Sequence, residues 1–514
     1  MHSLSPRKNS SGNAMRQFYT IDTYHSGKTG YSLLPFRFLR LDQDRELLVT
    51  DVGEYAIVPT GTTDQLVHNR LDAGSTLYKT LKGKQLLYDH DSAALLDVLA
   101  TKYRTKKSFL NGFAKLHIFV VTLRCDHSCH YCQVSRQTTD RTLYDMSPEV
   151  AERSLQLMMR VPAKDLTLEF QGGEPLLAFE TIKYTVARAK ELAATHDKNL
   201  QIVICTNLAY ATDEVLAYCR DEQIKLSTSL DGPAFLHNAN RPRPGNNSYE
   251  LTIDGINRAR KVIGTQNVAA VMTTTRRSLD YPIEIIDEYR KQDFHSIFLR
   301  PISPYGFAVK SKHRTGYEMA RFLDFYKKGL AYILELNRQG ANLQEVYAKI
   351  ILTKILTPYP TGYVDLQSPT GSGTGVLVYN YNGALYASDE SRMLAEMNDE
   401  SFCLGNVMTD DYRAILTGGP MQRLLAASCN EALPGCADCA LQPYCGADPV
   451  FHHATQGDLF GHRPTSGFCF KNMEVITHLF QLIAKNDREL LRIFFSWIRD
   501  QGHKDMREEV PACA

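Results

Sequence analysis

Three cysteines, Cys125, Cys129 and Cys132, stand close together in the run CDHSCHYC. Thiolates at such short spacing are typical ligands of iron–sulfur clusters and of zinc. A four-iron cluster has four iron sites, so three cysteines leave one iron free to bind a small molecule and to deliver an electron to it. Structural zinc usually has four ligands, and His127 or His130 could complete such a site. The run therefore predicts a metal centre, with an open cluster favoured over zinc.

Two later runs contain further groups that could bind a ligand. In QGGEP, the glycines Gly172 and Gly173 let the backbone come close to a ligand, and Glu174 adds an acceptor for an ammonium group. A plain turn after a strand would also explain an isolated GGEP string. The run SLDGPAFLHNANR contains Ser229 and Arg241, and an arginine is suited to paired hydrogen bonds with a carboxylate.

The elements that must position these groups alternate between strand and helix from residue 117 onward. Six apolar runs are typical of parallel strands, and they cover residues 117–123, 165–171, 201–207, 224–230, 267–274 and 296–301. Between them lie helical segments such as SPEVAERSLQLMM, which has a serine cap and a proline in its first turn. This pattern predicts an α/β fold with a partial (β/α)6 TIM barrel.

The chemistry of such a barrel belongs at the carboxyl ends of its strands, where the loops converge. The cysteine run follows the first strand, GGEP the second, Asn207 closes the third, and SLDGP follows the fourth. A zinc site at the cysteines would leave this agreement unexplained. The sequence therefore predicts one site at this end of the barrel.

Other regions flank the barrel. Residues 31–58 alternate apolar and polar side chains, which predicts antiparallel strands, and helical patterns begin at Thr63 and Asp91. We therefore expect five parts. They are a disordered tail (1–15), a small N-terminal α+β domain that could be winged-helix-like and recognise a peptide (16–110), the barrel (111–315), an iron–sulfur auxiliary domain (316–475) and C-terminal helices (476–514).

Composition narrows the classes of function. The chain has 514 residues, with 58 lysines and arginines against 57 acidic residues, so its charge does not favour nucleic acid or an anionic membrane as a partner. The polar N-terminus lacks the apolar core of a signal peptide, and no window is apolar enough to span a membrane, which predicts a cytoplasmic protein. Twelve cysteines in such a chain favour metal over disulfides, and we expect Cys205, Cys219 and Cys513 to be incidental thiols.

The run C-x3-C-x-Y-C, with GGEP downstream, resembles the radical S-adenosylmethionine (SAM) enzymes over about residues 115–475. The resemblance implies that Cys125, Cys129 and Cys132 hold a 4Fe-4S cluster whose open iron binds the amino and carboxylate groups of SAM. It implies that an electron from this cluster cleaves SAM to a 5′-deoxyadenosyl radical, which abstracts a hydrogen atom from the substrate.

The same resemblance gives roles to two groups of residues. Gly172, Gly173 and Glu174 are expected to hold the methionyl amine. Tyr131, the aromatic residue before the third cysteine, is expected near the adenine, with core packing as the alternative.

Four further residues are candidates for the rest of the expected SAM site. Ser229 and Arg241 are candidates for the methionyl carboxylate, and Arg243 is close enough in sequence to compete with Arg241. Asn207 is a candidate for the ribose, although a simple turn cap explains it equally well.

A second cysteine group lies near the C-terminus. Cys436, Cys439 and Cys445 stand in CADCALQPYC, and Cys469 follows. Four thiolates would close either a cluster or a zinc site, and spacing alone does not choose between them. Resemblance to the SPASM extension of radical SAM peptide maturases implies that these four cysteines hold an auxiliary 4Fe-4S cluster.

The chain departs from the full extension, which carries a second auxiliary cluster. Pro449 and Ser388 stand where two of its cysteines are expected, and the pair near residues 371–375 is missing. We therefore expect one auxiliary cluster. Cys403 and Cys429 are too few to hold another without other ligands.

The resemblance also indicates a substrate class. Enzymes with this extension act mostly on ribosomally made peptides, and the runs LRCDHSCHYCQVSRQ and LRPISPYGFA resemble the maturases of the His-Xaa-Ser peptide system. That resemblance implies a precursor peptide, a second radical SAM partner of the HxsC type, and an external electron donor such as flavodoxin or ferredoxin.

Two alternatives remain. An anaerobic sulfatase-maturating enzyme would use Asp389 as a catalytic base, although a solvated turn aspartate is as good an explanation of this residue. A non-enzymatic iron–sulfur protein would carry electrons or act as a scaffold.

Overall fold

The computed structural model describes residues 30–89, 93–132, 134, 136–138 and 140–499. The tail expected at residues 1–15 lies outside this part of the chain. Among the helices that are described, none is long and apolar enough to cross a membrane.

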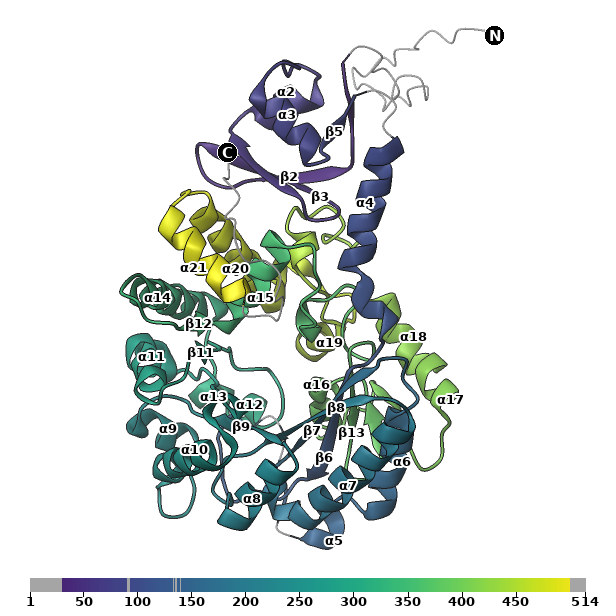
Figure 1. The fold of residues 1–514 in the computed structure, drawn as a ribbon, viewed down its shortest axis with the longest axis vertical. Coiled ribbons are helices and arrows are strands. Elements are labelled where there is room, and N and C mark those ends of the chain that lie inside the picture. The colour runs from purple at the N-terminus through teal and green to yellow at the C-terminus, as the bar shows by residue number, and fades with distance from the viewer. Residues whose placement is uncertain (1–29, 90–92, 133, 135, 139, 500–514) are drawn as a thin grey trace, which may run out of the picture.

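An eight-stranded sheet lies in the lower half of the molecule as drawn in Figure 1. Its strand order is β10-β9-β8-β7-β6-β13-β14-β15. Strands β6 to β10 pair in parallel, and β13 adds to the free edge of β6, also in parallel. The expected α/β fold with a partial barrel is confirmed. The bounds are β6 (Leu116–Thr122), β7 (Asp165–Gly172), β8 (Asn199–Cys205), β9 (Lys225–Ser229), β10 (Val268–Val271), β13 (Val376–Tyr379), β14 (Ala384–Tyr386) and β15 (Cys403–Asn406).

Helices connect the parallel strands and cover the outer face of the sheet (Figure 1). The helix predicted from SPEVAERSLQLMM is present, with the Ser147 hydroxyl accepting from the Val150 amide at 3.2 Å and Pro148 in the first turn. The bounds are α5 (Arg141–Tyr144), α6 (Pro148–Met158), α7 (Phe179–Thr195), α8 (Asp213–Asp221), α9 (Ala234–Asn240), α10 (Ser248–Ile263) and α11 (Pro282–Lys291).

The sixth strand of the barrel differs from expectation in its pairing. Strand β11 covers only Ser296–Ile297 and pairs with β12 (Gln344–Glu345), outside the main sheet. The chain beyond it is held by the carboxylate of Glu345, which accepts from the Leu299 amide at 3.2 Å. Since Pro301 has no N–H to donate, a long strand cannot continue there.

The N-terminal part forms a three-stranded antiparallel sheet, with strands β2 (Phe36–Arg40), β3 (Arg45–Thr50) and β4 (Tyr55–Pro59). The antiparallel strands expected in residues 31–58 are therefore confirmed. Leu48, Ala56 and Val58 pack on the helices of this part in a small core of their own. The other elements are β1 (Ser32–Leu33), α2 (Thr62–Val67), α3 (Thr76–Gly83), β5 (Leu87–Tyr88) and α4 (Ala93–Lys106).

The far face of this small sheet packs against the C-terminal part of the chain. Leu47 and Val49 of β3 belong to the main core. The Tyr444 hydroxyl donates to the Gly53 carbonyl at 2.9 Å, and the rings of Tyr55 and Phe480 meet edge to face at 5.1 Å. The N-terminal sheet is thus fixed next to the second cysteine group.

The remaining elements lie between and after these parts. An Asn-Gly turn joins β13 and β14, which are antiparallel, and the Gly383 amide donates to the Asn380 carbonyl at 2.9 Å. Cys469 lies in the first turn of α20. The bounds are α12 (Phe307–Lys310), α13 (Lys312–Thr315), α14 (Met319–Arg338), α15 (Val346–Leu356), α16 (Asp389–Ala395), α17 (Tyr412–Thr417), α18 (Gly419–Ala426), α19 (Pro449–Gln456), α20 (Gly467–Ile483) and α21 (Arg488–Arg499).

Candidate active site

A cavity of about 390 Å³, here called the barrel cavity, opens at the carboxyl ends of the parallel strands. Most of the residues singled out from the sequence line it. They are Cys125, Cys129, Tyr131, Cys132, Gly172, Gly173, Asn207, Ser229, Arg241 and Asp389. The fold therefore brings together groups that are up to 264 positions apart (125 to 389) in one space large enough for a small molecule.

The three N-terminal cysteines lie in the loop after β6. Burial raises the pKa of the Cys129 thiol to about 12, and the neighbouring Cys132 raises it further. Burial also raises the pKa of Cys125, with Glu174 and Cys129 adding to the effect. The thiols are thus close enough to interact electrostatically. A metal that binds them must displace their protons.

The chemistry of this loop fits an open cluster better than zinc. Cys125, Asp126 and His127 have ligand atoms within 4.8 Å of one another, so a small metal site could be considered there. However, both ring nitrogens of His127 already have partners. Nδ1 lies 2.9 Å from Asp126 Oδ1, and Nε2 lies 2.8 Å from the Ser248 hydroxyl. His127 is therefore tied into the protein, which leaves the three cysteines without a fourth ligand from this histidine.

Gly172 and Gly173 are required by the approach of two strands. A Cβ atom on Gly172 would overlap the carbonyl oxygen of Thr122, and one on Gly173 would overlap that of Arg124. Gly172 also has a φ of +149°, which side chains rarely adopt. The Gly173 amide donates to the Thr122 carbonyl at 2.8 Å. The glycines thus hold the cysteine loop against the end of β7, and they line the barrel cavity as well.

Glu174 points into the protein rather than into the barrel cavity. It is fully buried, and its carboxylate accepts from the Leu176 amide at 3.0 Å, the Thr206 hydroxyl at 2.6 Å and the Asn207 amide at 2.8 Å. Burial raises its pKa to about 7 despite these bonds. In this geometry Glu174 joins the ends of β7 and β8.

Tyr131 and Arg241 are held together by Asp231, a residue that sequence reasoning missed. The Tyr131 hydroxyl donates to Asp231 Oδ2 at 2.7 Å, and Arg241 Nε donates to the same atom at 3.1 Å. The Arg241 guanidinium also lies over the Tyr131 ring, 5.3 Å from its centroid. Asp231 is fully buried. It belongs to the SLDGP motif, and its place in that motif was the signal by which the sequence could have indicated it.

Asn207 and Arg243 belong to a second polar cluster at the cavity wall. The side-chain nitrogen of Asn207 donates to Asp126 Oδ1 at 2.8 Å, and its side-chain oxygen accepts from the Ala209 backbone amide at 2.8 Å. The bond to Ala209 is the turn cap that the sequence offered as an alternative role for Asn207. Arg243 lies 3.4 Å from Asp126 Oδ2. Arg243 is therefore engaged with Asp126, whereas Arg241 is one of the residues that line the cavity.

The inner wall of the barrel adds residues that the sequence did not indicate. Glu169 and Gln171 of β7 line the cavity, and the Gln171 amide donates to Glu169 at 2.6 Å. Burial raises the pKa of Glu169, and the negative charge of Asp389 contributes to this increase. Cys205, expected to be an incidental thiol, lines the same wall, whereas Cys219 is fully buried in the core. These groups line the same cavity as the cysteine loop.

The four C-terminal cysteines also lie near one another. Burial raises the pKa of Cys445 to about 12 and that of Cys469 to about 11, and Cys436 and Cys439 contribute to both increases. These mutual effects place the four thiols at one location, where a shared metal centre could bind them.

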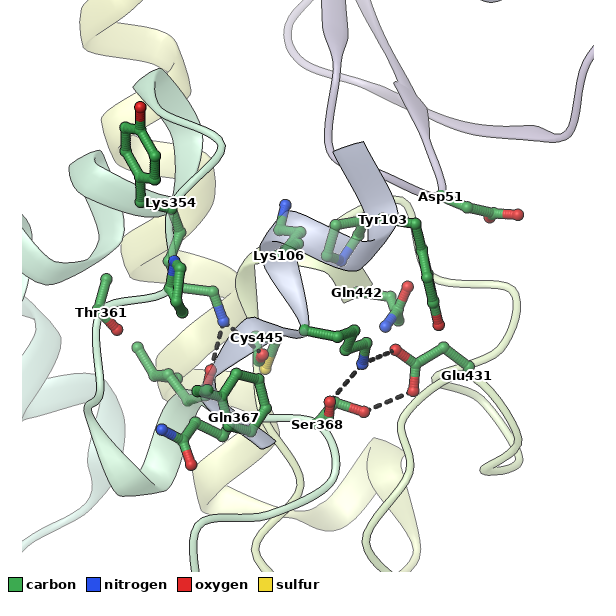
Figure 2. A pocket seen from close by; sticks show the side chains of 16 residues that line it. Asp51, Tyr103, Lys106, Lys354, Thr361, Gln367, Ser368, Glu431, Gln442 and Cys445 are labelled. Carbon is green, nitrogen blue, oxygen red and sulfur yellow. Dashed lines mark hydrogen bonds and ion pairs between the residues drawn. The ribbon is translucent and has the colours of Figure 1, made fainter. Parts of the chain in front are cut away.

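Three lysines line a cavity together with Cys445, one member of this second cysteine group (Figure 2). Lys354 extends toward Cys445, and its ammonium donates to the Cys445 carbonyl at 2.9 Å. Lys106, from the end of α4, donates to the Val52 carbonyl at 3.0 Å, and burial lowers its pKa to about 7. Lys107 forms an ion pair with Glu431 at 2.5 Å. The N-terminal part thus contributes two lysines next to the expected auxiliary cluster, one of them paired with Glu431.

Comparison with known proteins identifies the barrel. Residues 119–296 match the family model described as the radical SAM superfamily, a domain type that implies SAM and a 4Fe-4S cluster. The radical SAM cyclopropyl synthase TigE of Paramaledivibacter caminithermalis is 22% identical over 259 residues, which are 48% of this chain and 51% of TigE. The serine-type anaerobic sulfatase-maturating enzyme of Bacteroides thetaiotaomicron is 24% identical over 185 residues, 36% of this chain and 44% of that enzyme. The matches thus span about half of each relative.

Solved structures show the same fold. The structure titled native anSMEcpe with bound AdoMet covers 74% of this chain and 99% of its own, with a TM-score of 0.60 at 15% identity. Streptococcus suis SuiB bound to precursor peptide SuiA covers 85% of this chain and 99% of its own, with a TM-score of 0.51 at 14% identity. Residues 119–296 therefore match a radical SAM domain, and the chain shares its fold with these solved structures.

Proposed function

We propose that this chain is a radical SAM maturase that modifies a ribosomally synthesised peptide, of the His-Xaa-Ser system type. The observation that carries the proposal is the barrel cavity, where Cys125, Cys129 and Cys132 face the same space as Ser229 and Arg241. When bound, the cluster and SAM would supply a 5′-deoxyadenosyl radical that abstracts a hydrogen atom from the peptide. The chain's own residues would orient SAM and the peptide.

Arg241 is the best candidate for the carboxylate of SAM. Its guanidinium lines the barrel cavity and is fixed from behind by Asp231, so its remaining N–H groups can serve a ligand. Tyr131 is fixed by the same carboxylate and would pack near the adenine. Gly172 and Gly173 would present backbone to the methionyl amine. The carboxylate of Glu174 already accepts three hydrogen bonds from the protein. Glu174 would therefore affect the methionyl amine only indirectly, by fixing the backbone around it.

A peptide substrate is supported by two observations. SuiB, which is similar in fold, was solved with a precursor peptide. The N-terminal sheet of this chain has β2 and β4 as edge strands, and Phe38 of β2 is 56% exposed. We propose that this N-terminal module binds the leader of the peptide by adding a strand to an edge.

The proposal includes one auxiliary 4Fe-4S cluster, held by Cys436, Cys439, Cys445 and Cys469. It also includes a cytoplasmic location, an external electron donor such as flavodoxin or ferredoxin, and a second radical SAM partner of the HxsC type.

A sulfatase-maturating activity is the second candidate, and Asp389 favours it. This residue lies in the first turn of α16 and lines the barrel cavity, 3.3 Å from the guanidinium of Arg392. Asp389 could therefore accept a proton from a substrate side chain in the cavity. The relative from Bacteroides thetaiotaomicron carries that activity in its name.

The decisive experiment uses anaerobically reconstituted protein with SAM and a chemical reductant. Release of 5′-deoxyadenosine is expected, and Arg241→Lys should raise the SAM concentration needed for half-maximal release, because lysine cannot make paired hydrogen bonds. Mass spectrometry of a co-expressed His-Xaa-Ser precursor and of a sulfatase peptide then separates the two candidates. Absence of 5′-deoxyadenosine from protein with a confirmed cluster would contradict both.

A further inference from the structure

A second cavity, here called the acidic pocket, lies beside the barrel cavity and has a volume of about 70 Å³. Arg300 lines both cavities, so the two are neighbours. Asp365 comes from the short 3-10 helix Val364–Leu366, Glu390 from the first turn of α16, and Asp448 from the cap of α19. The pocket therefore joins three segments of the C-terminal part next to the barrel.

The described residues that line the acidic pocket include three carboxylates and only two cationic side chains, Arg300 and Lys471. Arg300 lies 4.0 Å from Glu390. Burial raises the pKa values of Glu390 and Asp448, and the nearby carboxylate of Asp365 contributes to both increases. If all three carboxylates were ionised, the lining of the pocket would carry one more negative than positive charge, so a bound cation would favour the ionised state.

Tyr305 adds an independent sign that a ligand is missing. Its side chain is 1% exposed and lines the acidic pocket, yet its hydroxyl has no hydrogen-bond partner among the described residues. Burial raises the pKa of Tyr305 well above its usual value, so the hydroxyl is neutral and able to accept a hydrogen bond. A buried hydroxyl without a partner is costly, which favours a donor from outside the chain.

The walls between these polar groups are aromatic. The rings of Phe298 and Tyr347 stack at 5.8 Å, and Lys471 places its ammonium 4.7 Å from the Tyr347 centroid. The other aromatic lining residues are Phe322, Tyr363, Phe451 and Phe468. Aromatic faces combined with carboxylates are the surroundings that cations prefer.

We propose that the acidic pocket binds a cationic side chain of the peptide substrate, an ammonium or a guanidinium group, and so selects the residue that enters the neighbouring barrel cavity. Such a group would donate to the Tyr305 hydroxyl and balance the charge of the ionised carboxylates. A volume of about 70 Å³ is enough for several waters or for one such head group. The inference rests on the proposed peptide-modifying function and narrows its substrate class.

The test measures binding of two small probes, n-butylammonium and methylguanidinium chloride, to the reconstituted full chain by calorimetry or by ligand-observed NMR. At least one cation is expected to bind with a dissociation constant in the millimolar range. The neutral analogue 1-butanol should not compete. Failure of both cations to bind would overturn the inference.

Variants locate the binding. Glu390→Gln with Asp448→Asn keeps the shape of the pocket and the cap of α19, and should weaken binding about tenfold. Tyr305→Phe removes only the hydroxyl and should weaken cation binding severalfold. This variant provides the test if the double variant does not fold. Glu180→Gln, on an exposed side chain, is the matched control and should change nothing. Equal binding by wild type and pocket variants would place the cations elsewhere and refute the inference.

The two proposals fail in different ways. Release of 5′-deoxyadenosine without a peptide depends on the barrel cavity and reports on the proposed function. Protein that releases it but does not bind the cations keeps the proposed function and loses the acidic pocket as a substrate site.

Discussion

The Arg241 guanidinium lies 3.1 Å from the carboxylate of Asp231, and this ion pair is buried at the wall of the barrel cavity. Asp231 is fully buried and also accepts from the Tyr131 hydroxyl and from the Thr273 amide, at 2.7 Å and 3.2 Å. One carboxylate thus sets the position of two candidate SAM contacts and ties them to the end of β10.

Asp231→Ala is expected to destabilise the protein strongly, because it leaves the Arg241 charge buried without a partner. Breaking such a pair typically costs about 3–5 kcal/mol. The free energy of unfolding from urea denaturation measures the loss. Arg258→Ala is the matched control, since it removes an exposed pair with Asp213 and should cost less than about 1 kcal/mol. Equal effects of the two changes would contradict the role given to Asp231.

Gly172→Ala is expected to move the cysteine loop away from β7, because its Cβ would overlap the Thr122 carbonyl and its φ is unfavourable for alanine. Strain of this kind costs about 1–3 kcal/mol. Thermal unfolding should shift down, and the variant should retain less iron. Gly83→Ala, where a new Cβ meets nothing within 4 Å, is the control. A Gly172→Ala protein with full stability and full iron content would show that the contact is not needed.

The sequence predicted the barrel and the position of its site because strand periodicity and strand-end motifs are local patterns. The six apolar runs corresponded to strands, and the motifs after four of them meet at the barrel cavity. Pairing is not local. Strand β11 is only two residues long because the Leu299 amide donates to the carboxylate of Glu345, which lies 46 positions further along the chain. No periodicity in residues 296–301 shows this.

The direction in which a side chain points was equally hard to predict from the sequence. Glu174 has the sequence context of a ligand-binding residue, yet its carboxylate is used by the amides of Leu176 and Asn207. Cys205 stood alone in the sequence, and only the alternation of β8 places it on the inner wall of the barrel. Asp365, Glu390 and Asp448 come from three distant segments, so no motif could have indicated the acidic pocket.

Iron content tests the expected clusters. Two four-iron clusters give about eight irons per chain, and replacing Cys125, Cys129 and Cys132 with alanine should remove about four of them. Elemental analysis and Mössbauer spectroscopy measure this directly. Cys403→Ser and Cys429→Ser are controls that should leave the iron content unchanged. About twelve irons, or zinc at the N-terminal cysteines, would contradict the expected clusters.

Stability should fall as the pH rises from about 4.5 to about 7, in part because of Glu345. This residue is fully buried, and its carboxylate accepts from the Tyr326 hydroxyl at 2.6 Å, the Ala348 amide at 2.6 Å and the Leu299 amide at 3.2 Å. Burial nevertheless raises its pKa from 4.5 to about 7. The folded state therefore binds the proton more tightly than the unfolded state does.

The sign of the effect follows from that difference. The contribution of Glu345 to stability is complete below the unfolded pKa of about 4.5 and is lost as the pH rises through the folded pKa of about 7. A shift of this size corresponds to a loss on the order of 3 kcal/mol. Glu345→Gln, which does not titrate, should flatten the pH dependence of the free energy of unfolding over this range. Glu191→Gln, at an exposed position, should leave it unchanged. Glu345 also fixes the chain that leads to Arg300. If the pH dependence of Glu345→Gln equals that of the wild type, water must reach the Glu345 carboxylate. The sixth barrel strand would then be held more loosely than its hydrogen bonds indicate.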